Sequence, residues 1–144
     1  MANESSATTV WEGNLAKGRG TTLAASGVLP EVEVTWQART ERTPGTTSPE
    51  ELLAAAHASC YCMAFSNVLD QAGSAPERLE ATATVSFVAG EGVKASRIVV
   101  RGRVPGIDQA AFEAAADDAG QNCPISGALR GNVEISVEAT LENE

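Results

Sequence analysis

The segment that begins at Ser48 carries the strongest helix pattern in the chain. Ser48 precedes Pro49, and Glu51 lies three positions after the serine, which is a capping-box arrangement with proline in the first helical position. Apolar and small side chains then recur at three- and four-residue steps until Gly73 ends the pattern. The spacing predicts a helix of about 24 residues, roughly 36 Å long at 1.5 Å per residue. In a chain of 144 residues such a helix should run through the middle of the fold.

Strand patterns lie on both sides of this helix. Before it, three Thr- and Val-rich segments predict a three-stranded antiparallel start, at 8–15, 19–25 and 31–40. After it come two strands, an alanine-rich helix, a short helix and a last strand, which are predicted near 81–87, 98–104, 109–119, 124–130 and 133–142. The order predicts one α+β domain over residues 1–144, with two three-stranded antiparallel halves around the long helix. It lacks the repeating βαβ unit of a Rossmann-like fold.

Charge and cysteine content limit the partners and the compartment. The net charge of −9 repels phosphate backbones and anionic membranes, so nucleic acid is not an expected partner. The longest apolar stretch, 52–69, is interrupted by polar residues and predicts no membrane span. Three cysteines are too few for a disulfide scaffold, and residues 1–10 lack a signal-peptide pattern. We therefore expect a cytoplasmic protein.

Cys60 and Cys123 lie in different predicted environments. Cys123 directly precedes the proline that opens a short helix, where free N–H groups favour a thiolate and lower the thiol pKa. Cys60 lies mid-helix on an apolar stripe and gains no such help, so a reactive Cys60 needs a cation from elsewhere, such as Arg39 or Arg42. The alternative is that Cys60 is a small buried hydrophobic residue.

His57 and Cys62 are the other polar candidates on this helix. His57 lies one turn before Cys60 on the same face, which fits a Cys-His dyad, a metal site with Cys123, or a core histidine with its hydrogen bonds satisfied. Cys62 lies about 200° around the helix from Cys60, so the two thiols cannot pair within it, and packing is its expected role. No zinc-type spacing occurs, and we expect neither a metal nor an organic cofactor.

Two segments carry a resemblance to a known family, SPEELLAAAHASC at 48–60 and NCPISGAL at 122–129. Together they resemble the paired motifs of the OsmC/Ohr family of thiol-dependent hydroperoxide reductases. Further pieces favour the osmotically inducible (OsmC) branch, namely WEG at 11–13, SGVL at 26–29 and VPGID at 104–108. The resemblance implies an α+β fold with three-stranded halves around a long helix, in an intertwined homodimer.

The resemblance also implies roles for the two cysteines. Cys60 matches the peroxidatic cysteine, which attacks an organic hydroperoxide, releases the alcohol and becomes a sulfenic acid. Cys123 matches the resolving cysteine, which forms a disulfide with it. A dithiol reductant, in this family a lipoylated protein, then restores both thiols. The implied role is defence against oxidative and osmotic stress.

Glu50 and Arg39 match the family pair that holds and ionises the peroxidatic thiol. One extra residue lies between Arg39 and the helix start, so Arg42 or Arg19 is an alternative for the arginine. Glu50 precedes Cys60 by ten residues, roughly 15 Å along a continuous helix, so a chain's glutamate cannot reach its own cysteine. Two such helices packed antiparallel about a two-fold axis would join Glu50 of one subunit to Cys60 of the other.

An apolar pocket beside the thiol would favour alkyl or lipid hydroperoxides. Met63, Phe65 and Phe112 are candidates to line it, although core packing is the favoured interpretation of all three. The expected function is therefore hydroperoxide reduction by Cys60 and Cys123. The alternatives are a Cys60–His57 hydrolase or acyltransferase, and a non-catalytic thiol redox sensor.

Overall fold

The computed structural model describes residues 1–143, and the chain divides into two compact units, residues 1–52 and the remainder. Each unit is described by itself below. The prediction of a single domain over residues 1–144 stays a prediction.

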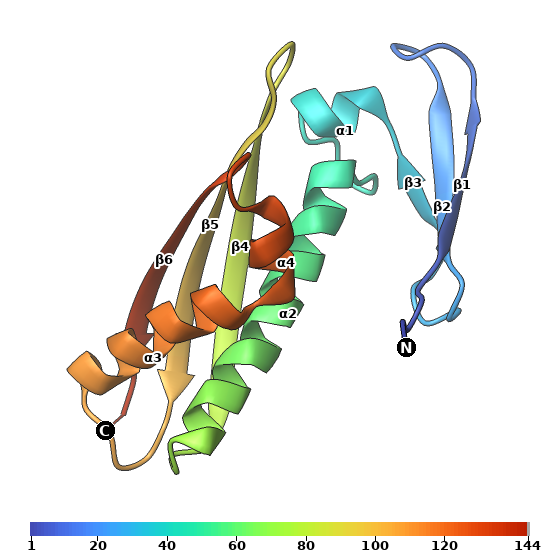
Figure 1. Ribbon diagram of the computed structural model, residues 1–144. Coiled ribbons are helices and arrows are strands. Elements are labelled where there is room, and N and C mark those ends of the chain that lie inside the picture. Colours follow the sequence, from blue (N-terminus) through green and yellow to red (C-terminus); the bar gives the residue numbers. More distant parts are fainter. Residues whose placement is uncertain (144) are drawn as a thin grey trace. The chain divides into compact units, whose positions relative to one another are not determined.

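The first unit contains a three-stranded antiparallel sheet, as predicted, in the order β1–β2–β3 (Figure 1). Its strands are β1 (Ala7–Glu12), β2 (Arg19–Ala24) and β3 (Val32–Val34). Trp11 lies opposite Gly20, and a Cβ atom at Gly20 would lie 2.8 Å from the Trp11 ring. A glycine is therefore required where the indole lies across the neighbouring strand.

The predicted strand at 31–40 is wrong in its second half. β3 ends at Val34, and a short helix, α1 (Trp36–Thr40), follows. The Thr35 hydroxyl accepts a hydrogen bond from the Ala38 backbone N–H at 3.0 Å and caps this helix. The alternation of apolar and polar residues around Trp36 was too short to distinguish a strand from a helix turn.

The long helix α2 covers Pro49–Gln71, 23 residues, and confirms the prediction. The Glu51 N–H donates to the Ser48 side-chain oxygen at 3.2 Å, as the capping pattern requires. The Glu51 carboxylate accepts instead from the Thr47 hydroxyl. At the other end Gly73 has φ = 85°, the left-handed conformation in which glycine commonly ends helices.

The second unit contains a three-stranded sheet of order β4–β5–β6, formed by β4 (Arg78–Val88), β5 (Gly92–Arg103) and β6 (Glu134–Leu141). β4 and β5 are antiparallel, but β6 runs parallel to β5, so the predicted antiparallel arrangement is wrong for this half. Two helices connect β5 to β6, α3 (Gln109–Asn122) and α4 (Pro124–Leu129). A crossover of this length returns the chain to the end of the sheet where β5 began, which makes β6 parallel.

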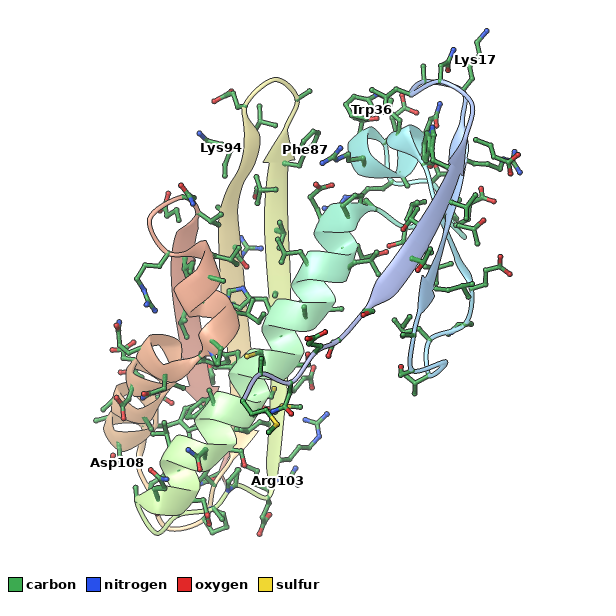
Figure 2. All side chains as sticks on the ribbon, turned by 45° about the vertical axis from the view of Figure 1, so that its right-hand side comes forward. Lys17, Trp36, Phe87, Lys94, Arg103 and Asp108 are labelled. Atoms are coloured by element: carbon green, nitrogen blue, oxygen red, sulfur yellow. The ribbon has the colours of Figure 1, made fainter. Side chains whose placement is uncertain are left out.

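Helices α2, α3 and α4 cover one face of this sheet (Figure 1). The Asp108 carboxylate caps α3 by accepting from the Ala111 N–H at 2.9 Å, and Figure 2 labels Asp108 beside that helix. Ten buried residues form the core between helices and sheet: Tyr61, Phe65, Leu69, Ile98, Val100, Val104, Phe112, Ala116, Ala119 and Cys123. Packing of this core therefore places Cys123, the residue between α3 and α4, near α2.

By length and composition α2 is the one helix within residues 1–143 that could cross a membrane. However, Tyr61, Phe65 and Leu69 on this helix are buried in the core. We interpret α2 as a core helix of the second unit.

Candidate active site

Cys60 and Cys123 come together in the second unit. Cys60 lies in the middle of α2, and Cys123 is the residue between α3 and α4. Both are free thiols, and each shifts the pKa of the other. Cys123 is 1% exposed, whereas Cys60 is half-buried. The structure thus brings the predicted cysteine pair together and leaves Cys60 as the more accessible sulfur.

Cys123 ends one helix and begins the next. Its N–H donates to the Ala119 carbonyl at 2.9 Å, and its sulfur accepts from the Ser126 N–H at 3.5 Å. Burial by itself raises the pKa of the Cys123 thiol, but hydrogen bonds from the Ser126 hydroxyl and N–H, from Cys60 and from the Ile125 backbone outweigh it. The pKa of Cys123 therefore lies below its ordinary value, as the position before Pro124 predicted.

Cys60 has the opposite shift. Burial raises the pKa of the Cys60 thiol, the Ile125 backbone acts against this, and the neighbouring Cys123 raises it further. Within residues 1–143, no basic side chain is among the groups that shift this pKa. The expectation that Cys60 needs a cation supplied from elsewhere therefore stands.

His57 is a core histidine with both ring nitrogens satisfied. It is fully buried, with Nδ1 2.7 Å from the Ser96 Oγ and Nε2 2.7 Å from the Ser126 Oγ. Burial lowers the pKa of His57 and keeps the imidazole neutral. The predicted alternative of a Cys60–His57 dyad is not formed, because serines take both nitrogens. Among the residues described, no three His, Cys, Asp or Glu side chains are placed to share a metal ion.

Arg39 and Glu50 form a bidentate ion pair in the first unit. Arg39 Nε lies 2.9 Å from Oε1 and 3.1 Å from Oε2 of Glu50, and Arg39 Nη2 lies 2.9 Å from Oε2. Glu50 is buried, and the Arg39 guanidinium lies 5.9 Å from the centre of the Trp36 ring. Of the alternative arginines, Arg42 is exposed, and Arg19 lies 3.8 Å from an exposed glutamate. Arg39 is thus the arginine that holds Glu50.

Cys62 points to a different environment from Cys60, as the helix geometry predicted. It lines a groove of about 640 Å³ with Met63 and residues near the start of β4, and burial raises its pKa. Met63 is 73% exposed, whereas Phe65 and Phe112 are fully buried with ring centroids 4.9 Å apart. Core packing, the favoured interpretation, is confirmed for the two phenylalanines and wrong for Met63.

Sequence reasoning missed Ser96 and Ser126, the two partners of His57. Ser126 had a usable signal, because it lies three residues after Cys123, the capping residue of α4. Ser96 had no such signal in the sequence. It is one of several small polar residues of a strand, and only the packing of the sheet against α2 brings it to His57.

The comparisons with known proteins agree on one family. A family model described as OsmC-like protein matches residues 39–138. Over 131 residues the chain is 36% identical to "Peroxiredoxin OsmC" of Escherichia coli (strain K12), covering 89% of this chain and 91% of that protein. It is 35% identical over 97 residues to "Organic hydroperoxide resistance protein" of Xanthomonas axonopodis pv. citri (strain 306), covering 63% of this chain and 65% of that protein. The longer match is the OsmC relative, as the predicted branch requires.

Solved structures share the fold. An organic hydroperoxide resistance protein OsmC from Legionella pneumophila superposes with a TM-score of 0.71 at 25% identity, covering 94% of this chain and 96% of that one. The organic hydroperoxide resistance protein OhrB of Bacillus subtilis gives a TM-score of 0.66 at 25% identity, covering 94% and 98%. With a matching family model over most of its length and a relative at 36% identity, this chain belongs to the OsmC-like protein family.

Proposed function

We propose that this protein is a thiol-dependent peroxidase that reduces organic hydroperoxides, alkyl or lipid-derived, to alcohols in defence against oxidative and osmotic stress. The observation that carries the proposal is the pair of free thiols of Cys60 and Cys123, with Cys60 packed against the core cluster that contains Cys123. The names of the relatives, a peroxiredoxin and an organic hydroperoxide resistance protein, support the same chemistry.

The two thiols have separate tasks. The Cys60 thiolate attacks the distal oxygen of the hydroperoxide, the O–O bond breaks, and the alkoxide takes a proton and leaves as alcohol. Cys60 is thereby oxidised to a sulfenic acid. The Cys123 thiolate attacks the Cys60 sulfur, the S–O bond breaks, and hydroxide takes a proton and leaves as water. A dithiol, for which we propose a lipoylated protein, then gives two electrons and returns both cysteines to thiols.

A second copy of the chain completes each site in this proposal. The raised pKa of Cys60 in one chain supports it, because the reaction needs a thiolate. Glu50 belongs to the same helix, ten residues before Cys60, which is roughly 15 Å of helix rise. Antiparallel α2 helices about a two-fold axis bring the Arg39–Glu50 pair of one subunit to Cys60 of its partner. Arg39 is the proposed cation, because Arg39 rather than Arg42 or Arg19 binds Glu50.

The proposal includes a cytoplasmic location and one domain over residues 1–144. Three free cysteines are consistent with a reducing compartment, where the oxidised pair can be recycled. An apolar substrate tail fits the alanine-rich flank of α2 near Cys60. Neither a metal nor an organic cofactor takes part.

The hydrolase alternative has less support, because both ring nitrogens of His57 are hydrogen-bonded to serine hydroxyls and neither is bonded to Cys60. A Cys-His hydrolase needs the imidazole as the base of its nucleophile. A redox sensor would use the same thiol pair, but it would not consume hydroperoxide in repeated catalytic cycles.

Steady-state consumption of cumene hydroperoxide with dihydrolipoamide tests the proposal. We expect turnover by the wild type, loss of at least a thousandfold in Cys60→Ser, and in Cys123→Ser a sulfenic acid that forms but is not converted to the intramolecular disulfide. Cys62→Ser is the matched control, since it removes a thiol of the same helix that faces the groove, and it should keep wild-type turnover.

Three results would contradict the proposal. Wild-type rates in Cys60→Ser exclude it as the peroxidatic residue. One stoichiometric oxidation without turnover indicates a sensor. A burst on activated esters that is lost in His57→Ala indicates a hydrolase.

A further inference from the structure

The Arg39 guanidinium is held on two sides within the first unit. Glu50 binds it edge-on, with Nε and Nη2 of Arg39 between 2.9 and 3.1 Å from the two carboxylate oxygens. The Trp36 ring lies beside the same group, with its centre 5.9 Å from the guanidinium carbon. A cation within about 6 Å of the centre of an aromatic ring is attracted by the ring electrons. The carboxylate and the indole therefore act on one group from different directions.

Trp36 and Arg39 meet because α1 places them on one side of its helix. They lie three residues apart, and side chains at this spacing are neighbours on a helix surface. Figure 2 labels Trp36 on this helix. Thr35 caps the helix, and the Gln37 side-chain amide donates to the Ala16 carbonyl in the loop between β1 and β2. These bonds attach α1, and with it the indole, to the rest of the first unit.

The backbone around Arg39 gives its side chain little support. Arg39 lies in the last turn of a helix of five residues, and a loop follows α1 directly. A helix this short is not stable by itself. The Arg39 side chain is 30% exposed, and a long side chain gives up rotamer freedom when it is held in one orientation. Contacts with the guanidinium itself must therefore fix its direction.

We propose that Trp36 is a positioning residue that keeps the Arg39 guanidinium directed at the thiolate of Cys60 of the partner subunit. The inference rests on the proposed function, which makes Arg39 the cation of that thiol. A hydrogen bond weakens steeply as its angle closes, so the direction of the guanidinium decides how far it stabilises the thiolate. Glu50 limits movement of the group within its plane, and the indole limits movement out of it. Loss of the ring should weaken the thiolate without removing the charge.

The other tryptophan of the chain provides a matched control. Trp11 belongs to the same unit, and a Cβ atom at Gly20 of the neighbouring strand would lie 2.8 Å from its ring. Its N–H donates to the Gly13 carbonyl at 2.9 Å. Trp11→Leu and Trp36→Leu each remove one indole from the first unit, but the ring that lies beside Arg39 is that of Trp36.

The first test measures the order of the Arg39 side chain without reference to any cysteine. In ¹⁵N-labelled protein the Arg39 Nε–H signal is identified by its loss in Arg39→Lys, and its relaxation gives an order parameter. We expect a rigid side chain in the wild type and in Trp11→Leu, and a lower order parameter in Trp36→Leu. An equally rigid Arg39 in Trp36→Leu would overturn the proposal, because Glu50 would then suffice to hold it.

The second test measures the effect on the thiol. The chain has three cysteines, so Cys62→Ser with Cys123→Ser leaves Cys60 as the single thiol. The rate of its alkylation by iodoacetamide, followed against pH, gives its apparent pKa. We expect Trp36→Leu to raise this pKa by about 0.3 to 1 unit, which slows alkylation about two- to tenfold at pH values below it, as the strength of such a ring contact allows.

Two further variants bracket this result. Trp36→Phe keeps a ring that attracts cations less strongly than indole, so its pKa should fall between those of the background and Trp36→Leu. Trp11→Leu should match the background. An unchanged Cys60 pKa in Trp36→Leu, or the same rise in Trp11→Leu, would contradict the proposal.

A double substitution separates action through Arg39 from a general loss of structure. In Arg39→Gln the thiol has lost its cation, so the Cys60 pKa should rise further than in Trp36→Leu. Adding Trp36→Leu to Arg39→Gln should raise it no more, since the ring has no cation left to hold. A rise of equal size in both backgrounds refutes the positioning role. If circular dichroism shows that Trp36→Leu does not fold, Trp36→Phe takes its place in both backgrounds.

Failure of this inference can be told apart from failure of the proposed function. An unchanged Cys60 pKa in Arg39→Gln refutes Arg39 as the cation, which belongs to the proposed function. A raised pKa in Arg39→Gln beside an unchanged one in Trp36→Leu refutes the role of Trp36 alone. In turnover, the acid limb of kcat/KM for cumene hydroperoxide should move to higher pH in Trp36→Leu and reach wild-type values there. An equal loss at every pH indicates a structural role and overturns the proposal.

Discussion

His57 shows how a single buried side chain depends on partners from two other elements. Its ring lies between Ser96 of β5 and Ser126 of α4, and both hydrogen bonds are 2.7 Å long. A protonated imidazole in this place would be desolvated, and among the described residues no charged group is a cause that offsets this effect on the pKa. The folded state therefore prefers neutral His57.

This preference predicts a loss of stability in mild acid. The pKa of His57 is lower in the folded state than in the unfolded state, where it is about 6.5. Below pH 6.5 or so the unfolded chain binds more protons, so the free energy of unfolding falls as pH falls, by about 1.4 kcal/mol for each unit between the two pKa values. Urea denaturation followed by circular dichroism, repeated from about pH 7.5 to 5, measures this fall in the free energy of unfolding.

The control for this prediction is His57→Gln. The variant should be less stable than the wild type at neutral pH, because the serines lose their fitted partner. Its stability should fall less steeply in acid, since only carboxylates remain to titrate. Parallel pH profiles for the two proteins would show that His57 does not contribute.

At the scale of elements, α3 packs on β5 through an aromatic ring above a glycine. Phe112 of α3 is fully buried, and a Cβ atom at Gly102 of β5 would lie 2.6 Å from its ring. The same ring lies against Phe65 of α2, which joins three elements in one layer. Because this packing is dense, it has no room for one more carbon.

Two glycine substitutions therefore have opposite expected effects. Gly102→Ala should lower the free energy of unfolding by about 1–3 kcal/mol, because the methyl group overpacks the site beside Phe112. Gly120→Ala in α3 is the control, since its Cβ atom would meet nothing within 4 Å. It should raise stability by up to about 1 kcal/mol, because alanine is a better helix former than glycine. Urea denaturation of both variants measures this, and a neutral Gly102→Ala would contradict the packing argument.

Local patterns predicted some elements well and others poorly. The limits of α2 follow from Ser48, Pro49 and Gly73, which act within one helical turn of the ends. The helix α1 was missed, because its cap at Thr35 lies inside a segment that reads as a strand. The direction of β6 was also wrong, since alternation shows that a segment is a strand but not which way it runs.

At the scale of the whole molecule, the proposed composite sites predict complementation between subunits. Neither the Cys60→Ser homodimer nor the Glu50→Gln homodimer should be active. After subunit exchange, each heterodimer has one site with the intact Glu50 of one subunit and the intact Cys60 of the other. An equal mixture should recover about a quarter of wild-type activity, because half of the dimers are mixed and each has one working site.

The control mixes Cys60→Ser with Cys123→Ser. Both changes fall in the cysteine pair of one chain, so a site built from one subunit's Cys60 and Cys123 stays defective in every combination. No recovery in the Glu50→Gln mixture, with exchange confirmed by mass, would show that the sites are not shared. Light scattering after size-exclusion chromatography checks the dimer independently.

The amino-acid sequence by itself determined the α+β class, the long helix α2, the start of α4 at Cys123–Pro124 and the low pKa expected there. Caps and periodic burial are interactions between residues a few positions apart, so the sequence order displays them directly. The pairing of Cys60 with Cys123 was predicted from family resemblance and not from spacing. Only the tertiary structure decided that β6 is parallel and that Ser96 and Ser126 enclose His57. The two serines lie 39 and 69 residues from His57 in the sequence, and burial in a shared core brings them together with it.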